Sequence, residues 1–344
     1  MSEVPPFTAP REVRSDRRGG LDRRTLLQVT GAASLLAPSV SQAQPRTYPD
    51  RTVRIVVPYP PGGFNDTHAR IVGEKLHDAW GQPVITDNRP GGGTIIGTDA
   101  VAKAAPDGLT LLVVAFPFGA NPSLYRQLPY DTVTSFAPVV LSGRTPNIVV
   151  VNSKLPIRSV RELIAAAKAQ PGKLNYGSTG VGSSNHLSME LFKNLAGVDI
   201  THVPYKGSAP MMTDLLGGHI DAAFDNLPNV LPHVRSGGVR ALGTSTATRS
   251  TFAPDIPTVA ESGVPGYDMD VWFGVVAPAG VPDEILDKLN AEINRVLRTS
   301  DVRARFTDQG VEPVGGSRSE FSDHIRTQIA KWAQVVKDAN IKPE

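Results

Sequence analysis

The chain has 344 residues, with 35 Lys and Arg against 33 Asp and Glu, and it contains no cysteine. This near-neutral balance argues against nucleic acid or an anionic membrane surface as a partner, because both select an excess of basic residues. The absence of cysteine excludes disulfides, thiolate metal sites and cysteine nucleophiles together.

Residues 1–43 have the pattern of an export signal. Arg23 and Arg24 precede an apolar segment that ends at the small-x-small sequence SQA of residues 41–43. This arrangement is typical of a twin-arginine signal, and the apolar segment is shorter than the roughly 20 residues of a membrane span. We therefore expect cleavage near Ala43, which removes six arginines and four acids and leaves 29 charges of each sign. The alternative is a disordered basic tail.

Beyond this segment, short β-branched runs alternate with helical patterns. The predicted strands are 53–57, 84–86, 110–114, 148–151, 220–224, 239–243 and 271–277. The predicted helices are 66–79, 94–104, 159–169, 184–195, 210–216, 283–297 and 319–337. This βαβ alternation predicts an α/β fold with parallel sheets covered by helices on both faces.

The length of the exported chain is sufficient for two lobes that each bury a core of their own. We assign residues 46–149 and 246–344 to lobe 1, and residues 150–245 to lobe 2. A cleft between two such lobes is the natural place for a ligand.

Three glycine-rich segments open predicted helices, at residues 60–63 (PPGG), 88–94 (NRPGGGT) and 176–184 (YGSTGVGSS). Ligands of parallel α/β sheets lie beyond the carboxyl ends of strands, where helix N-termini present unpaired amides and a positive dipole end. Each segment by itself would more often be a simple connecting turn. Together the three predict one anion that is held from several sides.

In the first of these loops, the expected function requires glycine. Gly62 and Gly63 permit a close approach of the backbone that a Cβ would block. Asn65 or Asp66 can cap the helix that follows. There is no Lys or Arg between Ile55 and Ala69, so attraction for an anion at this loop must come from amides and the helix dipole.

Six longer segments resemble, in this order, the Bug family of substrate-binding proteins of tripartite tricarboxylate transporters, also called the TctC type. They are PYPPGGFNDTHAR, DNRPGGGTIIGTDAVAKAAPDGLTLL, ANPSLYRQLPYD, YGSTGVGSSNHLSMELFKNLAGVDITHVPYKGSAP, DLLGGHIDAAFDN and APDIPTVAESGVPGYD. The resemblance implies an α/β fold of the type II periplasmic binding protein class, with mixed, mostly parallel sheets in two lobes. It also implies a periplasmic receptor that is not an enzyme and uses no cofactor. Its two lobes close on a small organic carboxylate, aliphatic or aromatic, which is passed to cognate membrane transporter subunits. We expect it to act as a monomer.

The resemblance also implies site residues. The family's first loop, where a ligand carboxylate is bound through backbone amides and ordered water, is matched by Tyr59, Pro61, Gly62, Gly63 and Asp66. The second-lobe loop and a position facing the cleft are matched by Ser178, Thr179, Ser183 and Asp225. This chain departs from the family at Phe64 and Asn65, where small residues or threonine are common. The predicted ligand-binding set is Tyr59, Gly62, Gly63, Phe64, Asn65, Asp66, Ser178, Thr179, Ser183, Lys206 and Asp225.

Other interpretations of single residues stay open at this level. Asp66 could cap its own helix rather than meet ligand, and Lys206 could be a solvated lysine rather than the nearest cation. His186 and Glu190 stand one helical turn apart, but a set of metal ligands is missing around them. Trp272 and Phe273, on a predicted strand, are more often core than a ligand platform.

Two alternative functions share parts of this pattern. A sensor subunit that docks on a signalling protein would have the same fold. A hydrolase or transferase could use the glycine loops as an anion hole, but it needs an activated nucleophile with a base. The sequence has no G-x-S-x-G elbow and no G-K-S/T after the glycines, so a receptor is favoured.

Overall fold

The computed structural model describes residues 48–341. The predicted export signal, with Arg23, Arg24 and the cleavage near Ala43, lies outside the described residues. Within residues 48–341 there is no helix of sufficient length and apolar character to cross a membrane.

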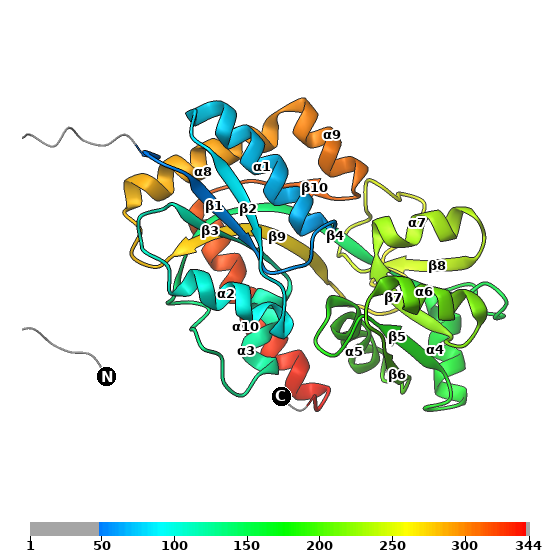
Figure 1. Ribbon diagram of the computed structural model, residues 1–344. Coiled ribbons are helices and arrows are strands. Elements are labelled where there is room, and N and C mark those ends of the chain that lie inside the picture. The colour runs from blue at the N-terminus through cyan, green and yellow to red at the C-terminus, as the bar shows by residue number, and fades with distance from the viewer. Residues whose placement is uncertain (1–47, 342–344) are drawn as a thin grey trace, which may run out of the picture. The chain divides into compact units, whose positions relative to one another are not determined.

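The strands and helices alternate along the chain (Figure 1). The strands are β1 Val53–Val57, β2 Val84–Asn88, β3 Thr110–Ala115, β4 Phe136–Asn152, β5 Asn175–Ser178, β6 Thr201–Pro204, β7 Ala222–Asn226, β8 Val239–Thr244, β9 Asp270–Pro278 and β10 Glu312–Pro313. The helices are α1 Phe64–Trp80, η1 Gly92–Thr94, α2 Ile95–Ala102, α3 Pro117–Leu124, α4 Val160–Ala169, α5 Ser184–Ala196, α6 Ser208–Gly217, α7 Leu227–Arg235, α8 Asp283–Arg298, α9 Ser300–Asp308 and α10 Arg318–Asp338. Every predicted element is present, and the ends are shifted by a few residues with one exception: the strand predicted at 148–151 is only the last part of β4, which begins at Phe136. The elements η1, α3, α7, α9, β5, β6 and β10 are not among the predicted ones.

Two parallel trios of strands form the ends of the sheet order β2-β1-β3-β9-β4-β7-β5-β6. In the first trio β1 lies between β2 and β3, and in the second β5 lies between β6 and β7. The antiparallel pairs involve β4 and β9, which join the trios. The prediction of a mixed α/β sheet is therefore confirmed.

Strand β4 takes part in both halves of this arrangement. Its residues 136–146 pair with β9, and its residues 147–152 pair with β7 and β8. We call β1, β2, β3, β9 and β10 the first strand group, and β5 to β8 the second. Figure 1 shows β4 running from the first group into the second. The division into lobes at about residues 150 and 245 stays a prediction.

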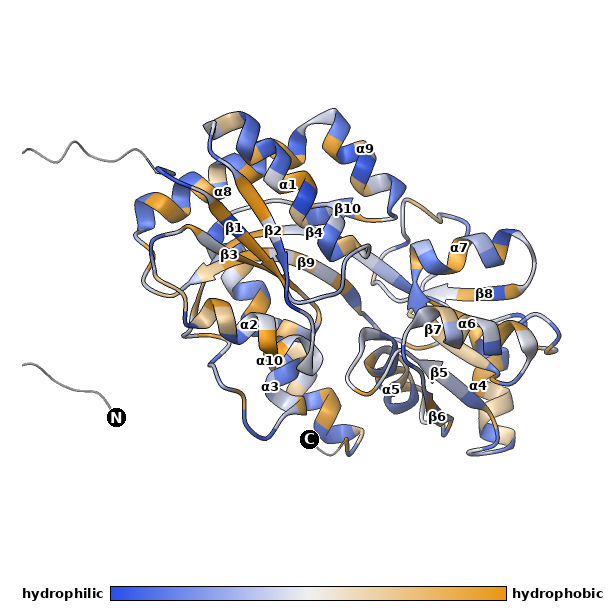
Figure 2. Ribbon diagram, viewed as in Figure 1, coloured by the Kyte–Doolittle hydropathy of each residue, from blue (hydrophilic) through white to orange (hydrophobic). Residues whose placement is uncertain are grey.

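The core of the first group follows the two-residue period of its strands. On β1, Val53, Ile55 and Val57 face one helical layer, which includes α1 and α8, and Val56 faces the other, which includes α2, α3 and α10. Figure 2 shows the resulting apolar strands between amphipathic helices. Trp272 and Phe273 of β9 are buried, so their interpretation as core residues is confirmed.

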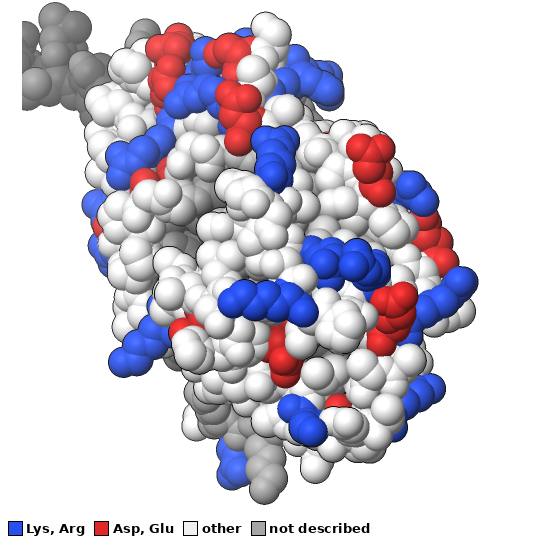
Figure 3. Space-filling view, turned by 90° about the vertical axis from the view of Figure 1, so that its right-hand side faces the viewer, with Lys and Arg blue, Asp and Glu red and all other residues white. Residues whose placement is uncertain are grey.

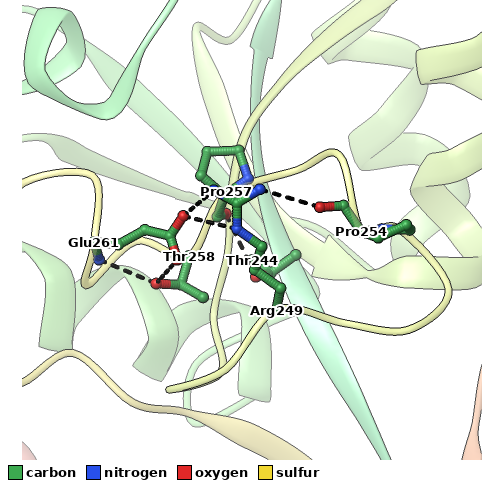
Figure 4. Close-up of polar contacts among 6 residues, drawn as sticks. All are labelled: Thr244, Arg249, Pro254, Pro257, Thr258 and Glu261. Atoms are coloured by element: carbon green, nitrogen blue, oxygen red, sulfur yellow. Dashed lines mark hydrogen bonds and ion pairs between the residues drawn. The ribbon is translucent and has the colours of Figure 1, made fainter.

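The segment that returns from β8 to β9 is held by its own polar contacts (Figure 4). The Arg249 guanidinium pairs with Glu261 and donates to the Pro254 carbonyl at 3.2 Å. The Glu261 N–H donates to the Thr258 hydroxyl at 3.0 Å, and the Thr244 N–H donates to the Pro257 carbonyl at 2.8 Å. These contacts give a long connection a defined path.

Candidate ligand-binding site

A cavity of about 360 Å³ lies where the carboxyl ends of four strands meet. The loops after β1, β2 and β5 and the helix after β3 supply its walls, which agrees with the general position of ligands in parallel sheets. The lining residues are Pro58, Tyr59, Pro60, Pro90, Gly91, Gly93, Thr94, Pro117, Asn121, Leu124, Tyr125, Thr179, Val181, Gly182 and Ser183.

The walls combine apolar surface with neutral hydrogen-bonding groups. Prolines, Leu124 and Val181 supply the apolar part, and Thr94, Asn121 and Thr179 are among the polar residues. Among the described residues, no Lys, Arg, His, Asp or Glu lines this cavity. A charged ligand would therefore be met by amides and hydroxyls.

The N-terminus of α5 borders the cavity through Gly182 and Ser183. Ser183 caps the helix, because its hydroxyl accepts the His186 N–H at 3.2 Å. The N–H groups of Ser184 and Asn185, the first two helical residues, have no partner within the helix. They lie at the positive end of the helix dipole, where an anion is stabilised.

Predicted residues of the loop after β5 fall into two groups. Thr179 and Ser183 line the cavity. Ser178 is completely buried, contacts the His202 ring with its hydroxyl 2.7 Å from Nε2, and accepts the Gly180 N–H at 3.1 Å. Ser178 therefore shapes the loop from behind.

Asp225, at the end of β7, is buried beneath this loop. Its carboxylate accepts from Asn185 at 2.9 Å, from Ser208 at 2.6 Å and from the Asn226 N–H at 2.8 Å. Burial raises the pKa of this carboxyl, against the effect of these hydrogen bonds. Asp225 links α5 to α6, and it does not line the cavity.

The loop after β1 is built differently from the prediction. Helix α1 begins at Phe64, its N-cap residue is Gly63, and no side chain caps it. The expectation that Asn65 or Asp66 is the capping residue is therefore wrong. Asp66 is the third helical residue, and its carboxylate accepts the Gly62 N–H at 3.1 Å.

Other groups hold Asp66 in place. Arg70 donates to its carboxylate at 3.0 Å, and Asn88 donates to it at 3.0 Å. The hydrogen bond from Arg70 is the largest effect that lowers the pKa of Asp66. The carboxylate is thus already paired, and neither Asp66 nor Asn65 lines the cavity.

Phe64 lies in an aromatic cluster. Its ring centroid is 4.5 Å from that of Phe273, 5.1 Å from Phe306 and 5.9 Å from His68. Of the predicted residues in this loop, Tyr59 lines the cavity, whereas Gly62, Gly63 and Phe64 do not. Lys206 is exposed and also lies outside the lining.

Residues after β2 and β3 complete the site. The loop 88–94 after β2 was predicted as one of the three anion-binding loops, but none of its residues, and no residue of the helix α3 that follows β3, was in the predicted ligand-binding set. Thr94 has φ of 81°, which is unusual for a β-branched residue. Asn121 stabilises this turn by donating to the Gly93 carbonyl at 2.9 Å, and its amide lies 3.4 Å from the Thr94 hydroxyl. Backbone strain of this kind gathers at functional sites. The only sequence signals were the glycine run before Thr94 and the family motif that contains Asn121 and Tyr125.

A second cavity, of about 430 Å³, has a different character. It lies between the segment 246–252, β4 and α10. Its wall includes charges of both signs, such as Arg144 and Asp270, which pair at 3.2 Å. Since its two arginines are already paired, Arg144 with Asp270 and Arg249 with Glu261, this cavity offers less to a small anion than the first.

Metal binding is not indicated in the part of the chain that the structure describes, where no group of three or more His, Cys, Asp or Glu is placed to hold an ion. The ring of His186 accepts the Gly182 N–H at 3.2 Å and lies 4.3 Å from the His202 ring. Glu190 accepts from Tyr176 at 2.6 Å and pairs with Lys193 at 2.8 Å.

Comparisons with known proteins place this geometry among solute receptors. Residues 68–341 match the family model described as tripartite tricarboxylate transporter family receptor, TctC. BugT of Bordetella pertussis is 40% identical over 319 residues, which are 92% of this chain and 98% of BugT. R. palustris Rpa4515 with adipate has a similar structure, with a TM-score of 0.77 and 41% identity over 86% of this chain and 100% of that one. MatC from Rhodopseudomonas palustris with bound malate gives a TM-score of 0.73 and 34% identity over 84% of this chain and 100% of MatC.

Proposed function

We propose that this chain, which belongs to the tripartite tricarboxylate transporter family of receptors, binds a small organic carboxylate in the cavity at the ends of β1, β2, β3 and β5. One observation carries the proposal. The cavity joins apolar walls to neutral donors at a helix N-terminus, with no ionised side chain among the described residues of its lining.

Neutral donors are sufficient for useful affinity. A hydrogen bond to a charged group contributes about 1.5–3 kcal/mol, and a partly buried helix dipole contributes up to about 2 kcal/mol. Four such donors and the dipole supply up to about 14 kcal/mol, which exceeds the roughly 8 kcal/mol of a micromolar complex and leaves about 6 kcal/mol to offset the cost of ordering.

The walls also favour one kind of carboxylate. Prolines, Leu124 and Val181 suit a methylene chain, whereas a ligand hydroxyl placed against them would lose its hydrogen bonds to water. Rpa4515 was solved with adipate and MatC with malate, so similar proteins have been found with both kinds of ligand. We propose that this receptor prefers an adipate-like acid to a hydroxylated one.

We assign the direct contacts to Tyr59, Thr94, Asn121, Thr179 and Ser183, which line the cavity. Supporting roles fall to residues that hold the loops from behind, namely Asp66, Ser178 and Asp225. The two lobes proposed from the sequence, 46–149 with 246–344 and 150–245, would close on the ligand. Strand β4 would then act as one of the crossing connections.

The location and partners of the protein follow from the same proposal. The segment with Arg23 and Arg24 would direct export to the periplasm, where the loaded monomer delivers its solute to membrane transporter subunits. On the face shown in Figure 3, basic side chains are interspersed with acidic ones, so this face does not form a surface of a single sign.

Replacing both Arg23 and Arg24 by lysine should retain the precursor in the cytoplasm. Mature protein in the periplasm of that variant would contradict the assignment.

The binding experiment compares adipate, malate and the neutral adipamide by calorimetric titration, with product analysis after long incubation. We expect adipate to bind without turnover and more tightly than malate, and we expect adipamide to fail. Turnover of any of these probes would favour the hydrolase or transferase alternative. A signalling protein captured by the loaded receptor, in place of transporter subunits, would favour the sensor alternative.

A further inference from the structure

The loops after β1 and β5 are built on the same plan. Each follows the central strand of a parallel trio and opens a helix, α1 or α5. Each contains a glycine in the left-handed region, Gly62 with φ of 96° and Gly182 with φ of 76°. In both, the fourth residue after that glycine, Asp66 or His186, is the third residue of the helix.

The side chains of these two residues make the same contact. The Asp66 carboxylate accepts the Gly62 N–H at 3.1 Å, and Nδ1 of His186 accepts the Gly182 N–H at 3.2 Å. An acceptor from the first helical turn therefore fixes each left-handed glycine. A glycine without such a contact could adopt many other conformations at little cost.

The two acceptors differ in charge. The negative charge of Asp66 is matched by Arg70, which donates to it at 3.0 Å. His186 accepts at Nδ1, so its ring is neutral and carries its proton on Nε2. Burial, followed by the influence of His202 and Lys193, lowers the pKa of His186 to about 3, which keeps the ring neutral.

There is little space around Gly182 for a side chain or a displaced backbone. Gly182 and Ser183 line the cavity, and a Cβ added at Gly182 would lie 2.6 Å from Cδ1 of Leu124, which also lines it. A carboxylate at residue 186 could supply the same hydrogen bond, but it would place an unpaired negative charge behind the donors that face the ligand.

We propose that His186 is a positioning residue of the ligand site: its neutral Nδ1 holds the Gly182 N–H and so fixes the turn that directs the start of α5 at the cavity. This inference rests on the carboxylate-binding function proposed above. His186 lies outside the cavity, and the inference is that the site needs an uncharged hydrogen-bond acceptor at this position.

Three substitutions separate the acceptor, the ring and the charge. In His186→Asn, the amide oxygen stands as many bonds from Cα as Nδ1 does, so the acceptor is kept and the ring is lost. His186→Leu removes the acceptor, and His186→Asp keeps it but adds a negative charge. Asn194→Leu, at an exposed position of the same helix, is the matched control.

We expect His186→Asn and the control to bind adipate within about threefold of the wild type. His186→Leu should bind about tenfold more weakly, the equivalent of one lost hydrogen bond. His186→Asp should also lose about tenfold or more, because the added charge repels the ligand. If His186→Asn is as weak as His186→Leu, the ring acts by packing and the inference is overturned.

A second measurement does not depend on any ligand. Exchange of the Gly182 amide hydrogen, followed by NMR, should be about tenfold faster in His186→Leu than in His186→Asn. Equal exchange in these two variants would overturn the positioning role even if affinities differ. If the wild type binds no carboxylate, the proposed function fails, and the exchange rates still decide whether His186 fixes the turn.

Discussion

Replacing His68 by phenylalanine should reduce the acid sensitivity of this protein. The His68 ring on α1 is completely buried, and neither ring nitrogen has a hydrogen-bond partner among the described residues. Its centroid lies 5.9 Å from Phe64, with the rings stacked, and 5.7 Å from Phe306, edge to face. The site therefore already has the aromatic neighbours that a phenylalanine ring needs.

The size of the effect follows from the pKa of His68, which burial lowers to about 4 from an ordinary value of 6.5. Below about pH 6.5 the unfolded chain binds a proton that the folded chain does not accept until about pH 4. The part of the stability that depends on the neutral His68 ring is thus complete above pH 6.5, and it is lost as the pH falls toward 4. At 1.36 kcal/mol per pH unit, His68 accounts for about 3 kcal/mol of this loss.

Urea unfolding at pH 7 and pH 4 measures this loss in the wild type and in His68→Phe. A change in packing alters the free energy of unfolding by the same amount at both pH values. The difference between the two free energies therefore reports only the titration. We expect the loss in His68→Phe to be smaller by about 3 kcal/mol. His77→Gln, at an exposed position of the same helix, is the control. The reasoning is refuted if the wild type and His68→Phe lose the same stability between the two pH values.

Three further predictions concern the site. Adipate affinity should change by less than about threefold between low and physiological salt, because screening acts mainly on exposed charges; a steep dependence in calorimetric titrations would reveal a basic group at the ligand. Gly62→Val should lower the free energy of unfolding by about 1–3 kcal/mol, since Gly62 has φ of 96°, whereas Gly63→Val at φ of −84° should cost much less. Equal losses in urea unfolding would contradict this difference. Phe64→Ala should cost about 3 kcal/mol of stability by opening the aromatic cluster, and should leave adipate affinity within about twofold. A large loss of affinity without loss of stability would place the Phe64 ring at the ligand.

The sequence predicted those elements whose pattern is local. The strand 53–57 and the helix after it have a clear period and a clear boundary, and both are present. Helix α3 was missed because Pro117, Gly119 and Pro122 make its sequence resemble a loop. That helix supplies Asn121 and other lining residues, so the site was predicted without one of its walls.

Single residues were harder to place than loops. The loop after β5 was predicted as part of the site, and Thr179 and Ser183 line the cavity. Phe64 was expected beside the ligand because it follows the glycines of the first loop. Its position is decided by Phe273 and Phe306, which lie more than two hundred positions later in the chain. No local pattern contains such information.

Because β4 passes from one strand group into the other, the two groups should not melt independently. Its first part, residues 136–146, pairs with β9, and its second part, residues 147–152, pairs with β7 and β8. Extracting this strand would open both cores at once, so neither group can unfold while the other remains intact. Scanning calorimetry should then show a single cooperative transition, with equal calorimetric and van't Hoff enthalpies.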